Sequence, residues 1–298
     1  MPMLRHPLTS RRPPWLSLLG LLPLLLSGCS QLLFVPMQQL VHTPDELGLD
    51  FENVTIESSD GVRLYAWFLP AEGKPHGTLL YLHGNAENIS THIGNVYWLP
   101  ARGYNVLLLD YRGYGLSSGE PSLQGAIDDI QAALRWLLQN PAIDPQRIVV
   151  LGQSLGADLG VAAVDRAGLA ARIRALVLDS AFSDYHQIVR EKLAGLWLTW
   201  PLQYPLSWLV SDHFSPSESI ARISPTPILI IHGAADAIVP LHHAYQLFAQ
   251  AREPKALWII PETGHIGALY RPAVRDRLVD YLDHVTSATR GQSNAALP

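Results

Sequence analysis

Six short runs of apolar residues recur along the chain, with segments of mixed polarity between them. They span residues 78–82, 106–109, 148–151, 175–178, 228–231 and 257–260. Continuous apolar runs of this length are typical of parallel strands that are covered on both faces. The clearest helical pattern spans residues 122–139, where apolar side chains recur at helical spacing until Asn140 and Pro141 end it. Strands that alternate with helices predict an α/β fold built on one doubly wound, mainly parallel sheet.

The segment before the first apolar run has a different pattern. Residues 54–56 and 62–69 alternate apolar with polar side chains on either side of Asp60-Gly61, which predicts an antiparallel β-hairpin. Residues 29–50 show no clear period, so we expect a tether and lead-in there, with order beginning near Phe51.

The chain beyond residue 50 shows no repeat, low-complexity tract or linker that would divide it. We therefore predict one domain over residues 51–288, with a small helical cap at about 185–223 and a flexible tail at 289–298.

Composition narrows the class of protein. The chain has 298 residues, of which 48% are hydrophobic and 16% charged, and its formal net charge is -5. These values exclude a disordered acidic chain and argue against nucleic acid as a partner. A single cysteine, Cys29, also excludes cysteine-rich zinc sites and thioredoxin-type sites. We expect a folded protein that binds neither nucleic acid nor a structural metal.

The N-terminus has the features of an export signal. Arg11 and Arg12 precede an apolar stretch at 15–26, and Leu26-Ser27-Gly28-Cys29 resembles the bacterial lipobox, in which the cysteine is lipidated. We expect residues 1–28 to be removed and Cys29 to carry the lipid. The alternative is an uncleaved membrane anchor, although the stretch is shorter than the roughly 20 residues that cross a bilayer.

Both interpretations of the N-terminus place the domain in the cell envelope and outside the cytoplasm. Ser30 after the cysteine resembles the sorting pattern of lipoproteins that reach the outer membrane of bacteria with two membranes.

A candidate nucleophile follows the third apolar run. The sequence Gly152-Gln153-Ser154-Leu155-Gly156 lies between that strand and a helix of small residues, as in a nucleophile elbow. The sharp turn places the serine in a strained conformation, and larger side chains at the flanking glycines would collide. Residues 115–119 fit the same pattern, but no strand enters them, so we interpret Ser117 and Ser118 as loop residues.

A serine nucleophile needs a histidine base and a carboxylate that orients it. His265 follows the last strand and Asp236 follows the one before it, which gives the order serine, acid, histidine. Asp179 and Asp184, after the preceding strand, are the reserve candidates for the acid. The alternative for Asp236 is a surface aspartate that completes a turn.

The tetrahedral intermediate of such an enzyme needs two backbone donors. We expect one from the amide of Leu155 and the other from the amide of Asn85, in the sequence His83-Gly84-Asn85 after the first strand. The alternative is that His83-Gly84 only ends a strand. We interpret Asp110 and Arg112, in the glycine-rich segment at 110–115, as residues that organise that loop.

Residues from about 51 to 286 resemble the α/β-hydrolase superfamily, in the branch of esterase-like and serine-peptidase-like hydrolases. The motifs His-Gly-Asn, Asp-Tyr-Arg-Gly-Tyr-Gly and Gly-x-Ser-x-Gly occur here in that order. The resemblance implies hydrolysis of an ester, a thioester or less often an amide through an acyl-enzyme, without a metal or organic cofactor. It departs from the family at Glu262-Thr263-Gly264, where relatives often have a glycine-rich run.

The leading hypothesis is a lipid-anchored serine hydrolase that acts on a small-molecule or lipid acyl substrate. A serine aminopeptidase and a non-catalytic envelope-binding lipoprotein that retains the fold are the alternatives. Residues 193–211 contain no charged side chain, but two prolines exclude a membrane span there. We expect Trp197 and Trp200 to line an acyl pocket and to face the membrane; the alternative is two short helices that only pack on the domain.

Overall fold

The structure is a computed structural model that describes residues 33–195 and 197–287. The predicted signal peptide at 1–28, the lipidation site at Cys29 and the tail at 289–298 lie outside the described residues.

An eight-stranded sheet forms the centre of the molecule, with the strand order β1-β2-β4-β3-β5-β6-β7-β8. Strands β3 to β8 are parallel to one another, whereas β2 is antiparallel to both of its neighbours. The strands are β1 (Glu52–Glu57), β2 (Arg63–Leu69), β3 (Gly77–Leu82), β4 (Tyr104–Leu109), β5 (Ile148–Gln153), β6 (Ala175–Asp179), β7 (Ile228–Gly233) and β8 (Lys255–Ile260). The predicted hairpin and the predicted parallel sheet are both confirmed.

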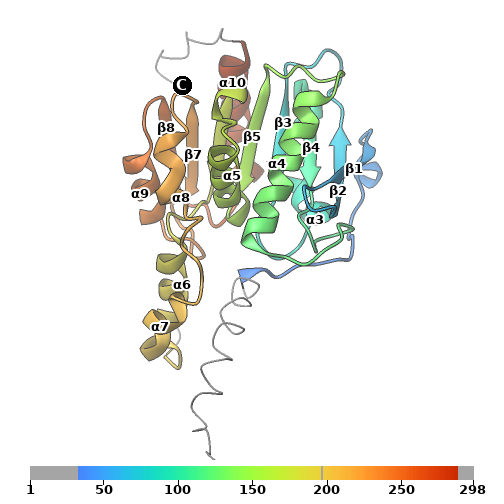
Figure 1. Cartoon of the computed structure of the whole chain (residues 1–298). Coiled ribbons are helices and arrows are strands. Elements are labelled where there is room, and N and C mark those ends of the chain that lie inside the picture. Colours follow the sequence, from blue (N-terminus) through green and yellow to red (C-terminus); the bar gives the residue numbers. More distant parts are fainter. Residues whose placement is uncertain (1–32, 196, 288–298) are drawn as a thin grey trace, which may run out of the picture.

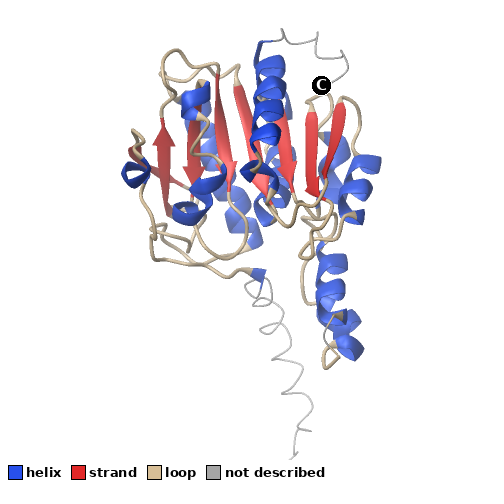
Figure 2. Ribbon diagram, turned by 180° about the vertical axis from the view of Figure 1, so that it is seen from behind, coloured by secondary structure: helices blue, strands red, loops and turns tan. Residues whose placement is uncertain are grey.

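Helices cover both faces of this sheet (Figure 1). The α-helices of the described chain are α3 (Ile89–His92), α4 (Leu123–Gln139), α5 (Leu155–Arg166), α6 (Tyr185–Ala194), α7 (Gln203–Ser207), α8 (Pro216–Ser219), α9 (His242–Gln250) and α10 (Pro272–Ser287), of which α6 and α7 project from the body (Figure 1). Along β3, Leu80 and Leu82 pack with α4 and α5, whereas Leu79 and Tyr81 pack with α10 on the opposite face (Figure 2). The apolar runs are continuous because each strand contributes to two cores.

Helix α4 begins where the sequence predicts it. The side chain of Ser122 accepts a hydrogen bond from the Gly125 N–H at 3.1 Å, and Asn140 follows the last helical residue. This cap satisfies one of the N–H groups that a helix leaves without an intrahelical partner at its first turn.

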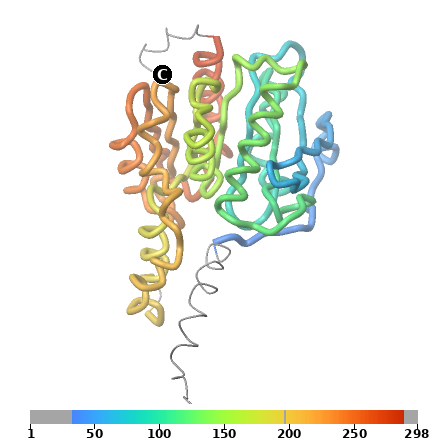
Figure 3. The backbone as a smooth tube through the Cα atoms, in the orientation of Figure 1, coloured from blue at the N-terminus to red at the C-terminus, as the bar shows by residue number. Residues whose placement is uncertain are grey.

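The lead-in is packed on the domain, and the expectation that order begins near Phe51 is wrong. Phe34 is buried and its ring meets that of Tyr114 at 6.3 Å between centroids. The Asn88 amide donates to the carbonyls of Met37 and Gln39 at 3.0 and 2.8 Å. These contacts bring the described part of the lead-in along the carboxyl ends of the strands, at the end of the molecule opposite the last turn of α10 (Figure 3).

Helices α6 and α7, joined through a turn of 3-10 helix at Trp200–Leu202, lie within residues 185–223, where we expect a cap, and we name them the cap. They leave the body at the carboxyl end of the sheet and project from it (Figure 1). None of the described helices is both long enough and apolar enough to cross a membrane.

Candidate active site

Ser154 occupies a sharp turn between β5 and α5. Its φ of 51° and ψ of -125° are strained for a residue with a side chain, and its N–H donates to the Asp179 carbonyl at 2.8 Å. A methyl group at Gly156 would lie 2.3 Å from the His83 carbonyl oxygen, and one at Gly152 would lie 2.5 Å from the Cα of Ala157. Only glycine therefore fits on either side of the serine, which explains the spacing of the motif.

A hydrogen bond joins His265 and Asp236 across the loops that follow β8 and β7. The Nδ1 atom of His265 lies 2.8 Å from Oδ2 of Asp236, and no other described carboxylate contacts this ring. The other oxygen of Asp236 accepts the N–H groups of Ile238 and Val239, both at 2.8 Å. The turn after β7 thus fixes the Asp236 carboxylate and directs it at His265. The aspartate completes a turn and also orients the histidine.

The environment of Asp236 keeps this carboxylate ionised. Burial acts to raise its pKa, but the hydrogen bond from His265 and those from the two backbone amides outweigh burial, and the pKa is lowered. An ionised carboxylate on Nδ1 fixes the imidazole proton there and leaves Nε2 free to accept a proton.

The reserve candidates lie elsewhere. Asp179 accepts the Gln153 amide at 2.7 Å, and burial raises its pKa to about 6. Asp184 is the N-cap of α6 and accepts the Gln187 N–H at 2.6 Å. Neither contacts His265 in the described chain, so Asp236 is the carboxylate that the geometry places on the base.

Two consecutive residues at the end of β6, Asp179 and Ser180, hold the nucleophile and the base in place. The Asp179 carbonyl accepts the Ser154 N–H, and the hydroxyl of Ser180 accepts the Ile266 N–H at 3.0 Å. The described contacts include no hydrogen bond between the Ser154 hydroxyl and His265; in enzymes without substrate this contact is often long and tightens on binding.

Leu155 and Asn85 flank the serine as predicted. Both residues line the same cavity as Ser154. Leu155 is the first residue of α5, where a helix leaves its N–H groups without intrahelical partners. The Asn85 side chain is occupied: its oxygen accepts the Val35 N–H and the Tyr114 hydroxyl at 2.9 and 2.8 Å. The side chain of Asn85 therefore holds the loop, and the backbone amide of Asn85 stays the predicted oxyanion donor.

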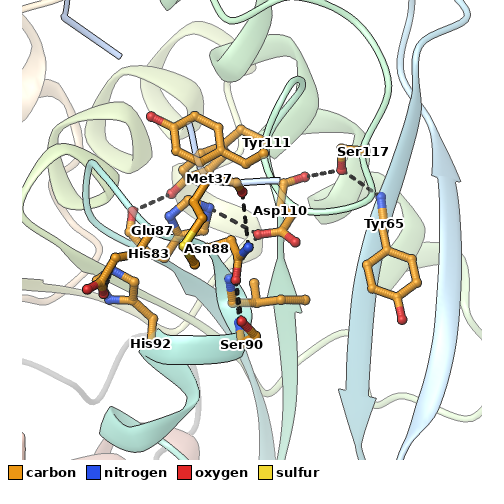
Figure 4. A network of polar contacts seen from close by, with 12 residues as sticks. Met37, Tyr65, His83, Glu87, Asn88, Ser90, His92, Asp110, Tyr111 and Ser117 are labelled. Atoms are coloured by element: carbon orange, nitrogen blue, oxygen red, sulfur yellow. Dashed lines mark hydrogen bonds and ion pairs between the residues drawn. The ribbon is translucent and has the colours of Figure 1, made fainter. Parts of the chain in front are cut away.

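A buried polar network holds the loop that carries Asn85 (Figure 4). The Nδ1 atom of His83 lies 2.7 Å from the Gly84 carbonyl, and its Nε2 lies 3.4 Å from Asp110. Burial lowers the pKa of His83 to about 3 and raises that of Asp110 to about 8, so both are neutral at pH 7. Asp110 also accepts the Ile89 N–H at 2.9 Å. His83 and Asp110 therefore serve to position the loop that carries Asn85.

Ser117 and Arg112, which the sequence also indicates as loop residues, make hydrogen bonds and ion pairs that hold the loop after β4. The Ser117 hydroxyl donates to the Asp110 carbonyl at 2.7 Å and accepts the Tyr65 N–H at 2.8 Å (Figure 4). The Arg112 guanidinium lies 2.7 Å from Asp129 and 2.7 Å from Asp60. The second Gly-x-Ser-x-Gly match is thus a brace between β2 and the loop after β4.

An apolar cavity of about 350 Å³ opens on Ser154. Part of its lining comes from the lead-in and the strand-end loops: Leu33, Val35, Phe182, Ile238 and Val239. The rest comes from the cap helix α6: Tyr185, Ile188, Val189, Lys192 and Leu193. Sequence reasoning missed these residues, although the position of Ile238 and Val239 directly after Asp236 could have indicated two of them.

The assignment of Trp197 and Trp200 to the pocket is corrected by the structure. Neither is among the described residues that line the cavity, and the two side chains are 87% and 60% exposed. The chain turns away from the sheet after α6, so the described domain does not bury these two rings. The wall that we predicted from the tryptophans is formed by the preceding helix.

Among the described residues, one group has the composition of a metal site. Ligand atoms of Glu191, His242 and His243 lie within 4.8 Å of one another. However, Nδ1 of His243 accepts the Ser183 N–H at 3.1 Å, so the proton lies on Nε2, which donates to Glu191 at 3.0 Å. A metal at Nε2 would displace that proton. The contacts instead fit a hydrogen-bonded clamp between α6 and α9.

Comparison with known proteins agrees with this geometry. The family model described as the prolyl oligopeptidase family matches residues 90–289. YfhR of Salmonella typhi is 38% identical over 256 residues, which cover 80% of this chain and 83% of that protein. The α/β hydrolase domain-containing protein WAV2 of Arabidopsis thaliana is 35% identical over 251 residues, or 79% of this chain and 80% of that one.

A solved structure shares the fold. The Pyrococcus furiosus esterase PF2001 superposes with a TM-score of 0.68 at 22% identity, over 86% of this chain and 98% of the esterase. The chain therefore belongs to the prolyl oligopeptidase family, within the α/β-hydrolase superfamily.

Proposed function

We propose that this hydrolase is a serine esterase that cleaves carboxylic esters, including acyl lipids or thioesters, through an acyl-enzyme on Ser154. We further propose that a lipid on Cys29 holds it at the membrane of the cell envelope. The observation that carries the substrate class is the lining of the cavity beside Ser154: ten of its side chains are aliphatic or aromatic and none is acidic. Such a cavity suits an acyl chain, which gains about 0.8 kcal/mol per buried methylene.

The proposed reaction assigns a role to each candidate residue. His265 takes the proton of the Ser154 hydroxyl as the oxygen attacks the ester carbonyl. The backbone amides of Leu155 and Asn85 donate to the oxyanion. His265 then gives the proton to the leaving alcohol, and water that is activated in the same way releases the acid. Asp236 stabilises the positive imidazole while it carries the proton.

A serine aminopeptidase is the second candidate, because the matching family is named for a peptidase. An enzyme that recognises a free α-amino group needs an acidic partner for it. The charged residue of the described cavity lining is a cation, Lys192, which would repel that group. The charge of the pocket thus favours the ester.

A panel of p-nitrophenyl acyl esters and aminoacyl p-nitroanilides tests this choice. We expect ester turnover to exceed anilide turnover at every acyl length. Faster hydrolysis of an aminoacyl anilide would replace the esterase with the peptidase. If no substrate is turned over and a fluorophosphonate probe leaves the protein unlabelled, the chain is instead a non-catalytic envelope-binding lipoprotein that retains the fold.

The proposed anchor has its own test. Mass spectrometry of the purified membrane form should find a chain that begins at Cys29 and carries fatty acyl groups, and Cys29→Ser should abolish that modification. An unmodified Cys29 in the membrane form would refute the lipobox interpretation without affecting the proposed chemistry.

A further inference from the structure

Apolar surface is concentrated at the far end of the cap. Of the fifteen large apolar side chains exposed in the described chain, seven lie between residues 197 and 209. We name this set the apolar tip: Trp197, Leu198, Trp200, Leu202, Tyr204, Trp208 and Leu209. The remaining eight are distributed over the rest of the described chain, where single exposed apolar residues are normal. A cluster of this kind on one projecting element indicates an interaction surface.

The base of the cap is tied to the body, so the tip has a defined direction. Glu191 of α6 contacts His242 and His243 of α9, both at 3.0 Å. Within the cap, the His186 ring lies 2.8 Å from the Val210 carbonyl, which joins α6 to the segment after α7. The apolar tip is therefore held away from the sheet, as Figure 1 shows for α6 and α7.

The composition of the tip matches the interface of a lipid bilayer. Three tryptophans and a tyrosine are mixed with leucines, and residues 193–211 carry no charged side chain. Tryptophan and tyrosine favour the boundary between headgroups and acyl chains, where their rings are buried and their polar atoms stay hydrated.

The other end of the chain places a membrane at the same face. Leu33 lines the cavity together with Leu193 of α6, and it lies four positions after Cys29 in the sequence. Four extended residues span about 14 Å at most. This step rests on the proposed anchor: a lipid on Cys29 would hold the bilayer within that distance of the cavity. Val35 and Ile238, which also line the cavity, are exposed and add apolar surface beside it.

We propose that the apolar tip inserts into the bilayer interface beside the lipid anchor, so that the cavity at Ser154 receives its acyl substrate from the membrane. Two attachments, one lipid and one aromatic, would fix the orientation of the enzyme, which a single flexible tether would leave free.

Fluorescence quenching by lipids tests the insertion without relying on activity. The full chain is reconstituted into phosphatidylcholine vesicles with brominated acyl chains, and compared with the variant W197F/W200F/W208F. We expect the wild type to lose at least twice the fraction of its tryptophan emission that the variant loses. Equal fractional quenching in both proteins would overturn the proposal.

A second experiment tests the consequence for substrate supply, with serine in place of the three tryptophans. W197S/W200S/W208S should reduce hydrolysis of a long-chain ester dissolved in vesicles by at least tenfold and leave that of soluble p-nitrophenyl butyrate unchanged. The control L116S/Y245S removes exposed apolar side chains elsewhere on the body and should change neither rate.

Two further outcomes distinguish failure of the membrane proposal from failure of the esterase assignment. If the serine variant is monomeric where the wild type is a dimer, and quenching is equal in both, the tip binds a second copy and the membrane proposal is wrong. If no ester is cleaved but the wild type is still quenched more than the phenylalanine variant, the esterase assignment fails and the insertion stands.

Discussion

The strands that lead to the carboxyl edge of the sheet and the apolar tip of the cap are both rich in apolar residues, yet they differ in what covers them. At the edge, Ser154 and Asp236 follow strands whose side chains are buried on both faces. In the cap, Trp197 and Trp208 lie on a projecting element with no second layer. Hydrogen bonds at defined distances fix the carboxyl edge of the sheet, whereas the cap exposes apolar side chains. Rigidity at the edge suits chemistry, whereas exposure at the tip suits contact with a partner.

The largest effect should come from removing the proposed nucleophile at the rigid edge. Ser154→Ala should lower ester turnover by about 10⁴-fold or more, because no other described group in the cavity can form the acyl-enzyme. The melting temperature should stay the same, because alanine keeps the Cβ atom and the backbone conformation of the turn. Residual turnover within tenfold of the wild type would remove Ser154 from the mechanism.

The next largest effect should distinguish the two aspartates at this edge. Asp236→Asn should lower turnover by about 10⁴-fold, because the asparagine can hold the wrong tautomer of His265. Asp179→Asn is the matched control: it is also buried at a strand end but binds Gln153, so we expect less than a tenfold change. A larger loss at Asp179, measured by the same steady-state kinetics, would move the acid to the earlier strand.

The contrast between α6 and the tip can be sharpened with soluble esters of increasing acyl length. Leu193→Trp should fill part of the cavity and shift the preferred ester to shorter acyl chains, by about fourfold in rate for each methylene excluded. Trp197→Ala, four residues later, should leave the profile unchanged. The reverse result would restore Trp197 to the pocket.

The smallest effect concerns stability of the loop behind Asn85. Burial raises the pKa of Asp110 to about 8, so between about pH 4 and pH 8 the folded protein holds a proton that the unfolded chain has lost. Asp110 therefore contributes stability that falls by about 1.4 kcal/mol per pH unit as the pH rises through this window. Asp110→Asn should remove that slope in urea unfolding, and identical slopes in both proteins would refute it.

Most of the fold could be predicted because a strand that is packed on both faces of the sheet is apolar along its whole length. The candidate site could also be predicted, since a parallel sheet brings the residues after its strands to one edge. The hydrogen bond between Asp236 and His265 fits that expectation.

The lead-in and the walls of the cavity could not be predicted. Residues 33–49 are held by side chains such as Asn88, which binds the backbone of Met37 and Gln39, and such contacts leave no periodicity in the sequence. The prediction for Trp197 is wrong for a related reason. An apolar pattern shows that a side chain is stabilised by burial, but it does not show which surface of the fold, if any, buries it.

The central claim is that Ser154 is the nucleophile of a hydrolase at this edge, and one measurement tests it most directly. The wild-type protein is labelled with a fluorophosphonate, digested, and mapped by mass spectrometry. The account predicts a single phosphonylated serine at Ser154, with labelling abolished when the protein is unfolded beforehand. Label on Ser117 or Ser118, or a folded protein that takes up none, would contradict it.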